Sequence, residues 1–337
     1  MIHENARTTV IKALSHKQTN RVPYEILLAD GCAKKVADAV GQDYIDNIGN
    51  FADCEYFRAF RRWISKDEQV DDFGTTFLWQ NYEQDICDIK SGIMKNDDMS
   101  TYKIPLFDIQ KQKDAFKAFD ASSRDNFCYV SLNFAIFERA WLLRGMEELL
   151  CDMLLNEKFV HELFESLCDY FYNLIDLSAQ YGFDGIQIGD DWGMQNGMIM
   201  GAELWRKMIR PHYAALVERI KSKGMYVIHH SCGDISDILG DMIDLGVDAY
   251  QTVQPEIYDL SSIKKKYGKN LCFWGGISTQ STMPYATAEE VRECVKRTIS
   301  TLFEDGGFVC GPTHTICNDV PVENILALVE TLKEFNY

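Results

Sequence analysis

The sequence predicts a (β/α)8 TIM barrel, which is an eight-stranded parallel α/β barrel, with an N-terminal extension and an inserted β-hairpin region. From about residue 125 onward, short β-rich runs alternate with longer helical patterns, as is typical of βα units on a parallel sheet. No GxGxxG motif follows the first strand candidate, which favours a barrel over an open dinucleotide-binding sheet. Barrels of this length often form one domain, so we expect residues 1–337 to be a single domain.

The strand candidates are short runs of apolar, β-branched and aromatic residues bounded by turn residues. "FCYVSLNF", "GFDGIQIGDD" and "GMYVIHH" are three of them. Seven to eight such units fit a closed barrel better than an open sheet. The candidates cover residues 21–30, 127–134, 182–191, 224–230, 247–254, 270–277 and 306–314.

The segments between these runs have helical spacing. Residues 202–224 place apolar side chains at intervals of four, which predicts an amphipathic helix. Pro211 interrupts this pattern and should kink or restart the helix. Residues 286–307 repeat the pattern, and Thr287 stands three residues before Glu290 as in a capping box.

Residues from about 50 to 125 do not show the alternating strand and helix pattern of the later residues. The stretch over residues 70–96 has the character of a β-hairpin or meander, and a polar connection without clear βα character follows it. We interpret residues 50–125 as an inserted excursion from the barrel that helps to cap the site.

Charge and composition exclude several classes of protein. The formal net charge of −17 opposes non-specific binding to phosphate, so we expect no nucleic-acid partner. No stretch approaches the roughly 18 apolar residues of a membrane span, and the N-terminal residues lack the apolar core of a signal peptide. Eleven cysteines without small-domain spacing indicate reduced thiols. These features predict a cytoplasmic protein that is not inserted in a membrane.

The strand ends supply the candidates for chemistry, because the C-terminal ends of barrel strands face the active site. The strongest constellation is His230-Ser231-Cys232, in which residues i and i+2 of an extended chain point the same way. Zinc favours imidazole and thiolate, and a catalytic zinc keeps three protein ligands and one open position. The remaining strand-end candidates are Asp190, Asp191, Gln254, Gly275, Gly276, and, as the third zinc ligand, Cys310, His314 or Cys317.

Simpler roles are open to the same residues. A histidine or cysteine at a strand end is usually only packed or hydrogen-bonded. Asp190 and Asp191 could bind substrate, orient a metal ligand or act as a general acid or base, but one of them could instead cap the turn after its strand. Asp71 or Asp72 of "DDFGTTF" could reach the pocket, or could be exposed hairpin carboxylates.

Several segments of the chain resemble the uroporphyrinogen decarboxylase superfamily. They include "RVP", "DDFGTTF", "DGIQIGDDWG", "HHSCGDI", "FWGGISTQ" and "GGFVCGPTHTI", and they follow the family's order over most of the chain. His230 and Cys232 resemble the zinc-binding pair of the methylcobamide-dependent methyltransferase branch. The N-terminal region lacks the arginine-rich segment with which uroporphyrinogen decarboxylases bind substrate carboxylates.

This resemblance implies a zinc-dependent methyltransferase or demethylase, with Asp190 and Asp191 in the catalytic site. A methyl group would move between a small methylated donor, or a thiol acceptor, and a corrinoid (cobalamin) on a partner protein. The resemblance also implies a homodimer. In that branch the third zinc ligand is a cysteine ahead of a P-x-x-N helix start. Here the position counted back from "PVEN" holds His314, and Cys310 is the alternative.

Two other functions fit the sequence. A metal-independent decarboxylase would use Asp190, Asp191 or a carboxylate of "DDFGTTF" to protonate or stabilise a pyrrole-like substrate. A non-catalytic protein that binds a small ligand is the second possibility, because a fold alone does not fix a function.

Overall fold

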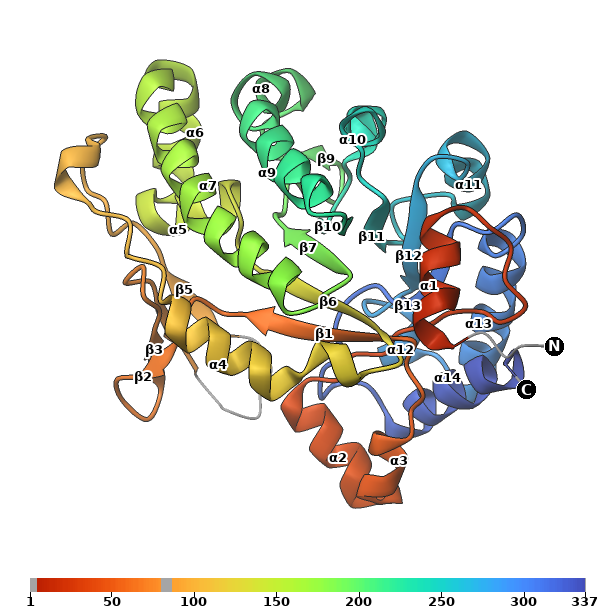
Figure 1. The fold of residues 1–337 in the computed structure, drawn as a ribbon. Coiled ribbons are helices and arrows are strands. Elements are labelled where there is room, and N and C mark those ends of the chain that lie inside the picture. The colour runs from red at the N-terminus through yellow and green to blue at the C-terminus, as the bar shows by residue number, and fades with distance from the viewer. Residues whose placement is uncertain (1–4, 80–86, 337) are drawn as a thin grey trace.

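A curled parallel β-sheet forms the centre of the molecule, and helices cover its outer face in the manner of a TIM barrel (Figure 1). The computed structural model describes residues 5–79 and 87–336. All strands of this sheet except the first are buried over most of their length, as expected for a parallel sheet that is covered on one face and filled on the other. In spatial order they are β1 (Ala52–Phe57), β6 (Phe127–Leu132), β7 (Gly185–Gly189), β10 (Tyr226–His230), β11 (Ala249–Val253), β12 (Cys272–Ile277) and β13 (Phe308–Pro312).

The strand predicted at residues 21–30 is not a strand, and that part of the prediction was wrong. The segment forms two isolated parallel bridges. Tyr24 pairs with Cys310 of β13, and Leu28 pairs with Ile316 in the loop after β13. On its other side, the Phe51 N–H donates to the Tyr24 carbonyl at 2.9 Å. The Asn50 side chain bonds both the N–H and the C=O of Ile26, each at 2.9 Å. A side chain therefore replaces the backbone ladder at the position of an eighth strand, between β13 and β1.

The excursion begins later than the sequence indicated. β1 lies inside the range 50–125, but it pairs in parallel with β6 along its whole length. The chain between β1 and β6 contains a four-stranded antiparallel sheet, which begins before the meander predicted over residues 70–96 and overlaps it only in part. Residues 80–86 of that stretch lie outside the described residues. The strands of this sheet are β2 (Arg62–Trp63), β3 (Glu68–Val70), β4 (Thr76–Leu78) and β5 (Asp88–Lys90), and a separate hairpin consists of β8 (Gly193–Met194) and β9 (Gly197–Met198).

The helices follow the predicted signals. The pattern over residues 202–224 divides into α8 (Ala202–Met208) and α9 (Arg210–Ser222), with Pro211 in the first turn of α9. The capping box of Thr287 and Glu290 begins α13 (Ala288–Leu302).

The other helices complete the outer layer, and none of the described helices is both long and apolar enough to cross a bilayer. Their bounds are α1 (Ala6–Leu14), α2 (Asp30–Val40), α3 (Gln42–Asp46), α4 (Ile109–Phe119), α5 (Phe137–Arg144), α6 (Met146–Leu155), α7 (Glu157–Gln180), α10 (Leu239–Leu245), α11 (Leu260–Tyr267), α12 (Thr282–Tyr285) and α14 (Val322–Glu334), with short 3-10 turns at Met99–Thr101, Ala121–Ser123 and Ser236–Ile238.

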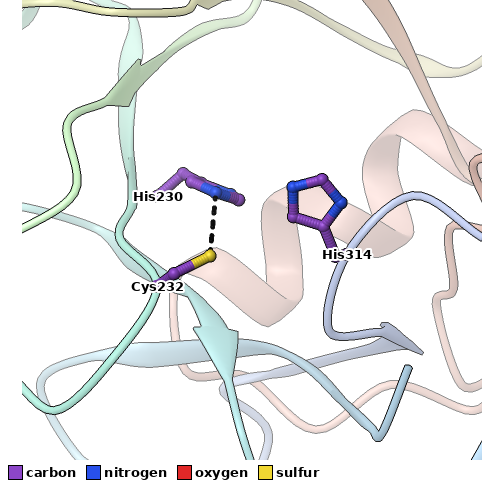
Figure 2. A group of neighbouring side chains, drawn as sticks. All are labelled: His230, Cys232 and His314. Carbon is purple, nitrogen blue, oxygen red and sulfur yellow. Dashed lines mark hydrogen bonds between the residues drawn. The ribbon is translucent and has the colours of Figure 1, made fainter. Parts of the chain in front are cut away.

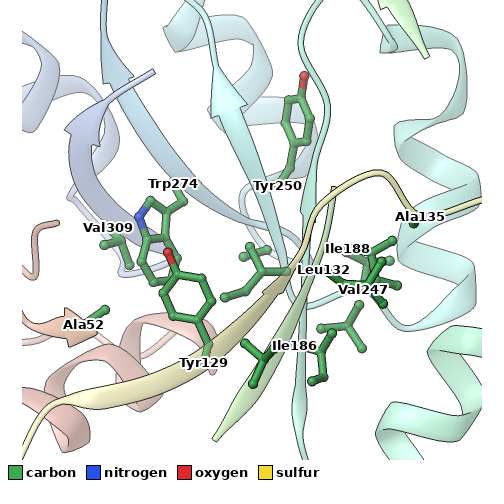
Figure 3. Packing of buried hydrophobic residues seen from close by; sticks show 14 of the residues in the cluster. Ala52, Tyr129, Leu132, Ala135, Ile186, Ile188, Val247, Tyr250, Trp274 and Val309 are labelled. Carbon is green, nitrogen blue, oxygen red and sulfur yellow. The ribbon is translucent and has the colours of Figure 1, made fainter. Parts of the chain in front are cut away.

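Buried hydrophobic side chains pack against the curled sheet (Figure 3). Tyr129 of β6 and Trp274 of β12 meet with ring centroids 5.8 Å apart. Beside them lies a buried carboxyl group, Glu25, whose two oxygens each accept from the Tyr129 hydroxyl at 3.0 Å. Burial raises the pKa of Glu25 from 4.5 to about 8, and the bond from Tyr129 only partly opposes this.

This carboxyl group should make the stability of the protein depend on pH. Between about pH 4.5 and pH 8 the folded chain holds a proton on Glu25 that the unfolded chain releases. Stability contributed by this site should therefore fall as pH rises, by up to about 1.4 kcal/mol per pH unit. The Glu25→Gln variant should show a flatter dependence, to be measured by urea unfolding at pH 6, 7 and 8. Equal slopes for the two proteins would contradict the prediction.

Candidate metal centre

Three side chains from two distant parts of the sequence meet at the C-terminal ends of the strands (Figure 2). His230 is the last residue of β10, Cys232 follows it, and His314 lies just beyond β13. The His230 Nε2 atom is 3.8 Å from the Cys232 Sγ atom. One donor atom from each of the three residues lies within 4.8 Å of the others. Nitrogen and sulfur ligands of a tetrahedral zinc are about 3.5 Å apart, so a shift of about 1 Å would suit the ion.

The other candidate donors lie elsewhere. Cys310 is fully buried, and it is outside the group of three. Cys317 is outside the group of three. His229 stacks on Trp192 with centroids 4.1 Å apart, on the opposite side of the strand from His230, as strand alternation predicts. Of the three sequence candidates, the structure places His314 beside His230 and Cys232.

The site holds the Cys232 side chain as a neutral thiol when no cation is present. Burial raises the pKa of Cys232 well above its usual range, and the negative charge of Asp191 raises it further. A thiol must lose its proton to become a metal ligand. Binding of a divalent cation here would therefore release a proton.

Asp190, which the sequence analysis proposed as catalytic, is buried at the start of α5. Its carboxylate is fully buried and accepts from the backbone N–H groups of Phe137 and Glu138, at 3.0 and 2.7 Å. The indole N–H of Trp192 donates to it at 2.9 Å. Burial raises the pKa of Asp190 to about 7, and these three bonds oppose the shift. All three donors hold the start of α5 and the turn after β7, so Asp190 has the capping role that the sequence allowed for one of the pair.

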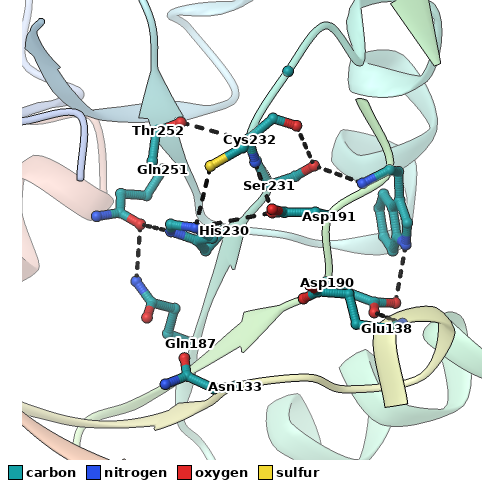
Figure 4. A network of polar contacts seen from close by, with 12 residues as sticks. Asn133, Glu138, Gln187, Asp190, Asp191, His230, Ser231, Cys232, Gln251 and Thr252 are labelled. Atoms are coloured by element: carbon teal, nitrogen blue, oxygen red, sulfur yellow. Dashed lines mark hydrogen bonds and ion pairs between the residues drawn. The ribbon is translucent and has the colours of Figure 1, made fainter. Parts of the chain in front are cut away.

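Asp191 faces His230 and Cys232 (Figure 4). Its Oδ1 atom accepts from the backbone N–H of Cys232 at 2.8 Å and lies 3.9 Å from the His230 Nε2 atom. The side chain is 36% exposed, so it can contact a ligand that enters the barrel mouth.

Glu138 is an acidic residue of the site that the sequence analysis missed. It lies near Asp191, whose backbone N–H donates to its carboxylate. Burial raises the pKa of Glu138 well above its ordinary value, and the charges of Asp191 and Asp190 add to this. The sequence feature that could have identified Glu138 is its position just after the strand predicted at residues 127–134, on the first turn of a helix that begins at the barrel mouth.

The remaining candidates have structural roles. Asp71 forms a buried ion pair with Arg139, and Asp72 is exposed. Gln254 accepts from the backbone N–H of Gly233 at 2.8 Å and so fixes the turn after Cys232. Gly275 and Gly276 both have positive φ angles, of 123° and 93°, which favour glycine.

The sequence is similar to proteins of known family. A family model described as uroporphyrinogen decarboxylase (URO-D) matches residues 77–335. A uroporphyrinogen decarboxylase of Hydrogenobaculum sp. is 29% identical over 184 residues, which are 54% of this chain and 50% of that protein. The methylcobamide:CoM methyltransferase MtaA of Methanosarcina barkeri is 25% identical over 178 residues, which are 50% of each chain. The chain thus spans about half the length of the curated relatives it matches.

The fold is similar to that of a solved structure over nearly its whole length. A methyltransferase from Methanosarcina mazei superposes with a TM-score of 0.78 and covers 99% of both chains, at 16% sequence identity. At this identity the likeness concerns the fold, and it supports the TIM-barrel-like architecture.

Proposed function

Because this chain belongs to the uroporphyrinogen decarboxylase (URO-D) family, we propose that it is a zinc-dependent methyltransferase or demethylase. In this proposal a methyl group moves between a small methylated substrate, or a thiol, and a corrinoid on a partner protein. The similarity to a methylcobamide:CoM methyltransferase supports this branch of the family. We further propose a cytoplasmic homodimer with one barrel domain per chain, in which the excursion between β1 and β6 caps the site.

The convergence of His230, Cys232 and His314 is the observation that carries the proposal. Two imidazoles and one thiol are the donor types that zinc prefers, and three protein ligands leave the fourth position open for substrate. A zinc ion held there would supply Lewis acidity, either to the heteroatom of a methylated donor or to the sulfur of a thiol acceptor.

The chain's own residues would prepare this site in two ways. Asp191 accepts from the Cys232 N–H and so holds the turn that presents the thiol. The carboxyl group of Glu138, whose pKa is raised, favours its protonated form beside Asp191 and limits the negative charge around the ligands. Asp191 also provides a partly exposed carboxylate, 3.9 Å from the His230 Nε2 atom, which could accept a hydrogen bond from substrate.

A metal-independent decarboxylase is the second candidate, because uroporphyrinogen decarboxylases are also among the relatives. In that case Asp191 or Glu138 would contact the substrate, and activity would be independent of His230, Cys232 and His314.

Methyl transfer should be measurable with a free corrinoid. We expect the zinc-loaded protein to consume methylcobalamin in the presence of a suitable small thiol, from a panel that includes CoM. The reverse reaction would be tested with reduced cobalamin and methoxy compounds or methylamines, and the visible spectrum of the corrinoid reports either direction. The Cys232→Ala variant should be inactive, and the Glu25→Gln variant should serve as an active control. Decarboxylation of uroporphyrinogen that persists in Cys232→Ala would overturn the methyltransferase proposal in favour of the second candidate.

A further inference from the structure

A row of buried polar side chains leads across the inside of the barrel to His230 (Figure 4). Gln251 of β11 is the register partner of His230, and its Oε1 atom is hydrogen-bonded to the His230 Nδ1 atom. The Gln187 Nε2 group of β7 donates to the same Oε1 atom at 3.1 Å. The hydroxyl of Ser131, the register partner of Gln187 on β6, lies 2.6 Å from the Gln187 Oε1 atom. Three strands thus contribute to one row that ends on a candidate metal ligand.

Each hydrogen bond of this row has a fixed donor and a fixed acceptor. An amide oxygen only accepts hydrogen bonds, so the Gln251 Oε1 atom, which accepts from the Gln187 Nε2–H, must also accept from the His230 Nδ1–H. His230 therefore carries its proton on Nδ1, and its Nε2 atom keeps the lone pair. That lone pair is on the atom that lies 3.8 Å from the Cys232 thiol.

We propose that Gln251 and Gln187 are positioning residues that set the tautomer and ring orientation of His230. Both are at most 7% exposed, so water does not compete for their hydrogen bonds. Gln251 acts directly on His230, and Gln187 acts through Gln251 by fixing which end of its amide faces the ring. The effect of these residues on zinc binding rests on the proposed function, but the tautomer of His230 does not.

A purely structural role for these amides makes a different prediction. If Gln251 only filled space, methionine, which has a similar length and volume, would replace it without effect on His230. If its oxygen matters, methionine would fail and glutamate, which offers an oxygen acceptor at the same place, would succeed. The pair Gln251→Met and Gln251→Glu therefore separates packing from hydrogen bonding.

The first measurement is zinc affinity by competition with a chromophoric chelator. We expect Gln251→Met to weaken zinc binding about 10–100-fold, as is usual when the partner of a metal-bound histidine is removed. Gln187→Met should cause a smaller loss, and Gln251→Glu should remain close to the unaltered protein. Thermal unfolding of each variant without metal checks that the fold is intact. Equal zinc affinity in Gln251→Met and the unaltered protein would overturn the proposal.

The second measurement needs no metal. Two-bond proton–nitrogen correlation spectra of metal-free protein with ¹⁵N-labelled histidine report which ring nitrogen carries the proton, with His230→Gln to assign the signal. We expect an Nδ1–H ring in the unaltered protein and in Gln251→Glu, and a shift toward Nε2–H in Gln251→Met. An Nε2–H ring in the unaltered protein would refute the inference. Absence of zinc binding together with the expected tautomers would refute the proposed function and leave the positioning role standing.

Discussion

Replacing Cys232 by alanine should lower the bound zinc from about one ion per chain to less than about a tenth of an ion, because one of three protein ligands and the only thiolate would be gone. His230→Ala should have the same effect. Metal content after metal-replete expression and desalting, by mass spectrometry, checks both variants. Cys151→Ala is the matched control, because that cysteine is exposed and outside the group of three.

His314 should behave as the third ligand in the same assay. His314→Ala should lose the metal, whereas His314→Cys should retain it, because a thiolate is an equally competent zinc ligand. Cys310→Ala and Cys317→Ala should keep the metal, since both lie outside the group of three. Zinc retained in Cys232→Ala and His230→Ala would mean that these side chains form a strand end without a metal role.

Part of this site could be predicted from local geometry. Residues two apart on an extended strand point the same way, so the pairing of His230 with Cys232, and the opposite orientation of His229, follow from alternation alone. The third donor depends on how the loop after β13 folds back over the mouth, which no periodic pattern encodes. The choice of His314 came from a resemblance to a family, and the structure is consistent with it.

The roles of the acidic residues could not be read from the sequence for a related reason. Asp190 and Asp191 are adjacent, and both follow the same strand. What separates them is that the free N–H groups at the start of α5 come within bonding distance of Asp190. That contact is tertiary, and so is the burial that raises the pKa of Glu138.

One strand was missed and another was wrongly predicted, because the side-chain pattern of each segment did not match its backbone pairing. β1 reads "ADCEYF", and its charged residues at alternate positions hide a strand that pairs along its full length with β6. The segment over residues 21–30 has the apolar composition of a strand, but it forms only isolated bridges on the side of β13. On its other side, the Asn50 side chain bonds the backbone groups of Ile26. In neither case does composition identify the hydrogen-bonding partner of the backbone.

The attachment of the excursion to the barrel depends on a buried ion pair. Arg139 of α5 donates to Asp71 of the excursion at 2.5 Å, and the two side chains are 3% and 0% exposed. Asp71 also accepts from the backbone N–H of Thr75 at 2.9 Å, which fixes its own turn. The guanidinium lies over the Phe73 ring, 4.4 Å from its centroid. Neither charge has access to bulk water, so each depends on the other.

Asp71→Asn should therefore cost about 3–5 kcal/mol of the free energy of unfolding, because it leaves the Arg139 charge buried without a counter-ion. Arg139→Met should cost a similar amount for the converse reason. The double variant should lose much less than the sum, since it removes both charges together. Urea unfolding of the four proteins gives the coupling energy. The exposed pair of Lys34 and Asp38 is the control, and Asp38→Asn should change stability by less than about 1 kcal/mol. Additive losses in the double variant would show that the two charges do not stabilise one another, and the excursion would then be held by its apolar contacts.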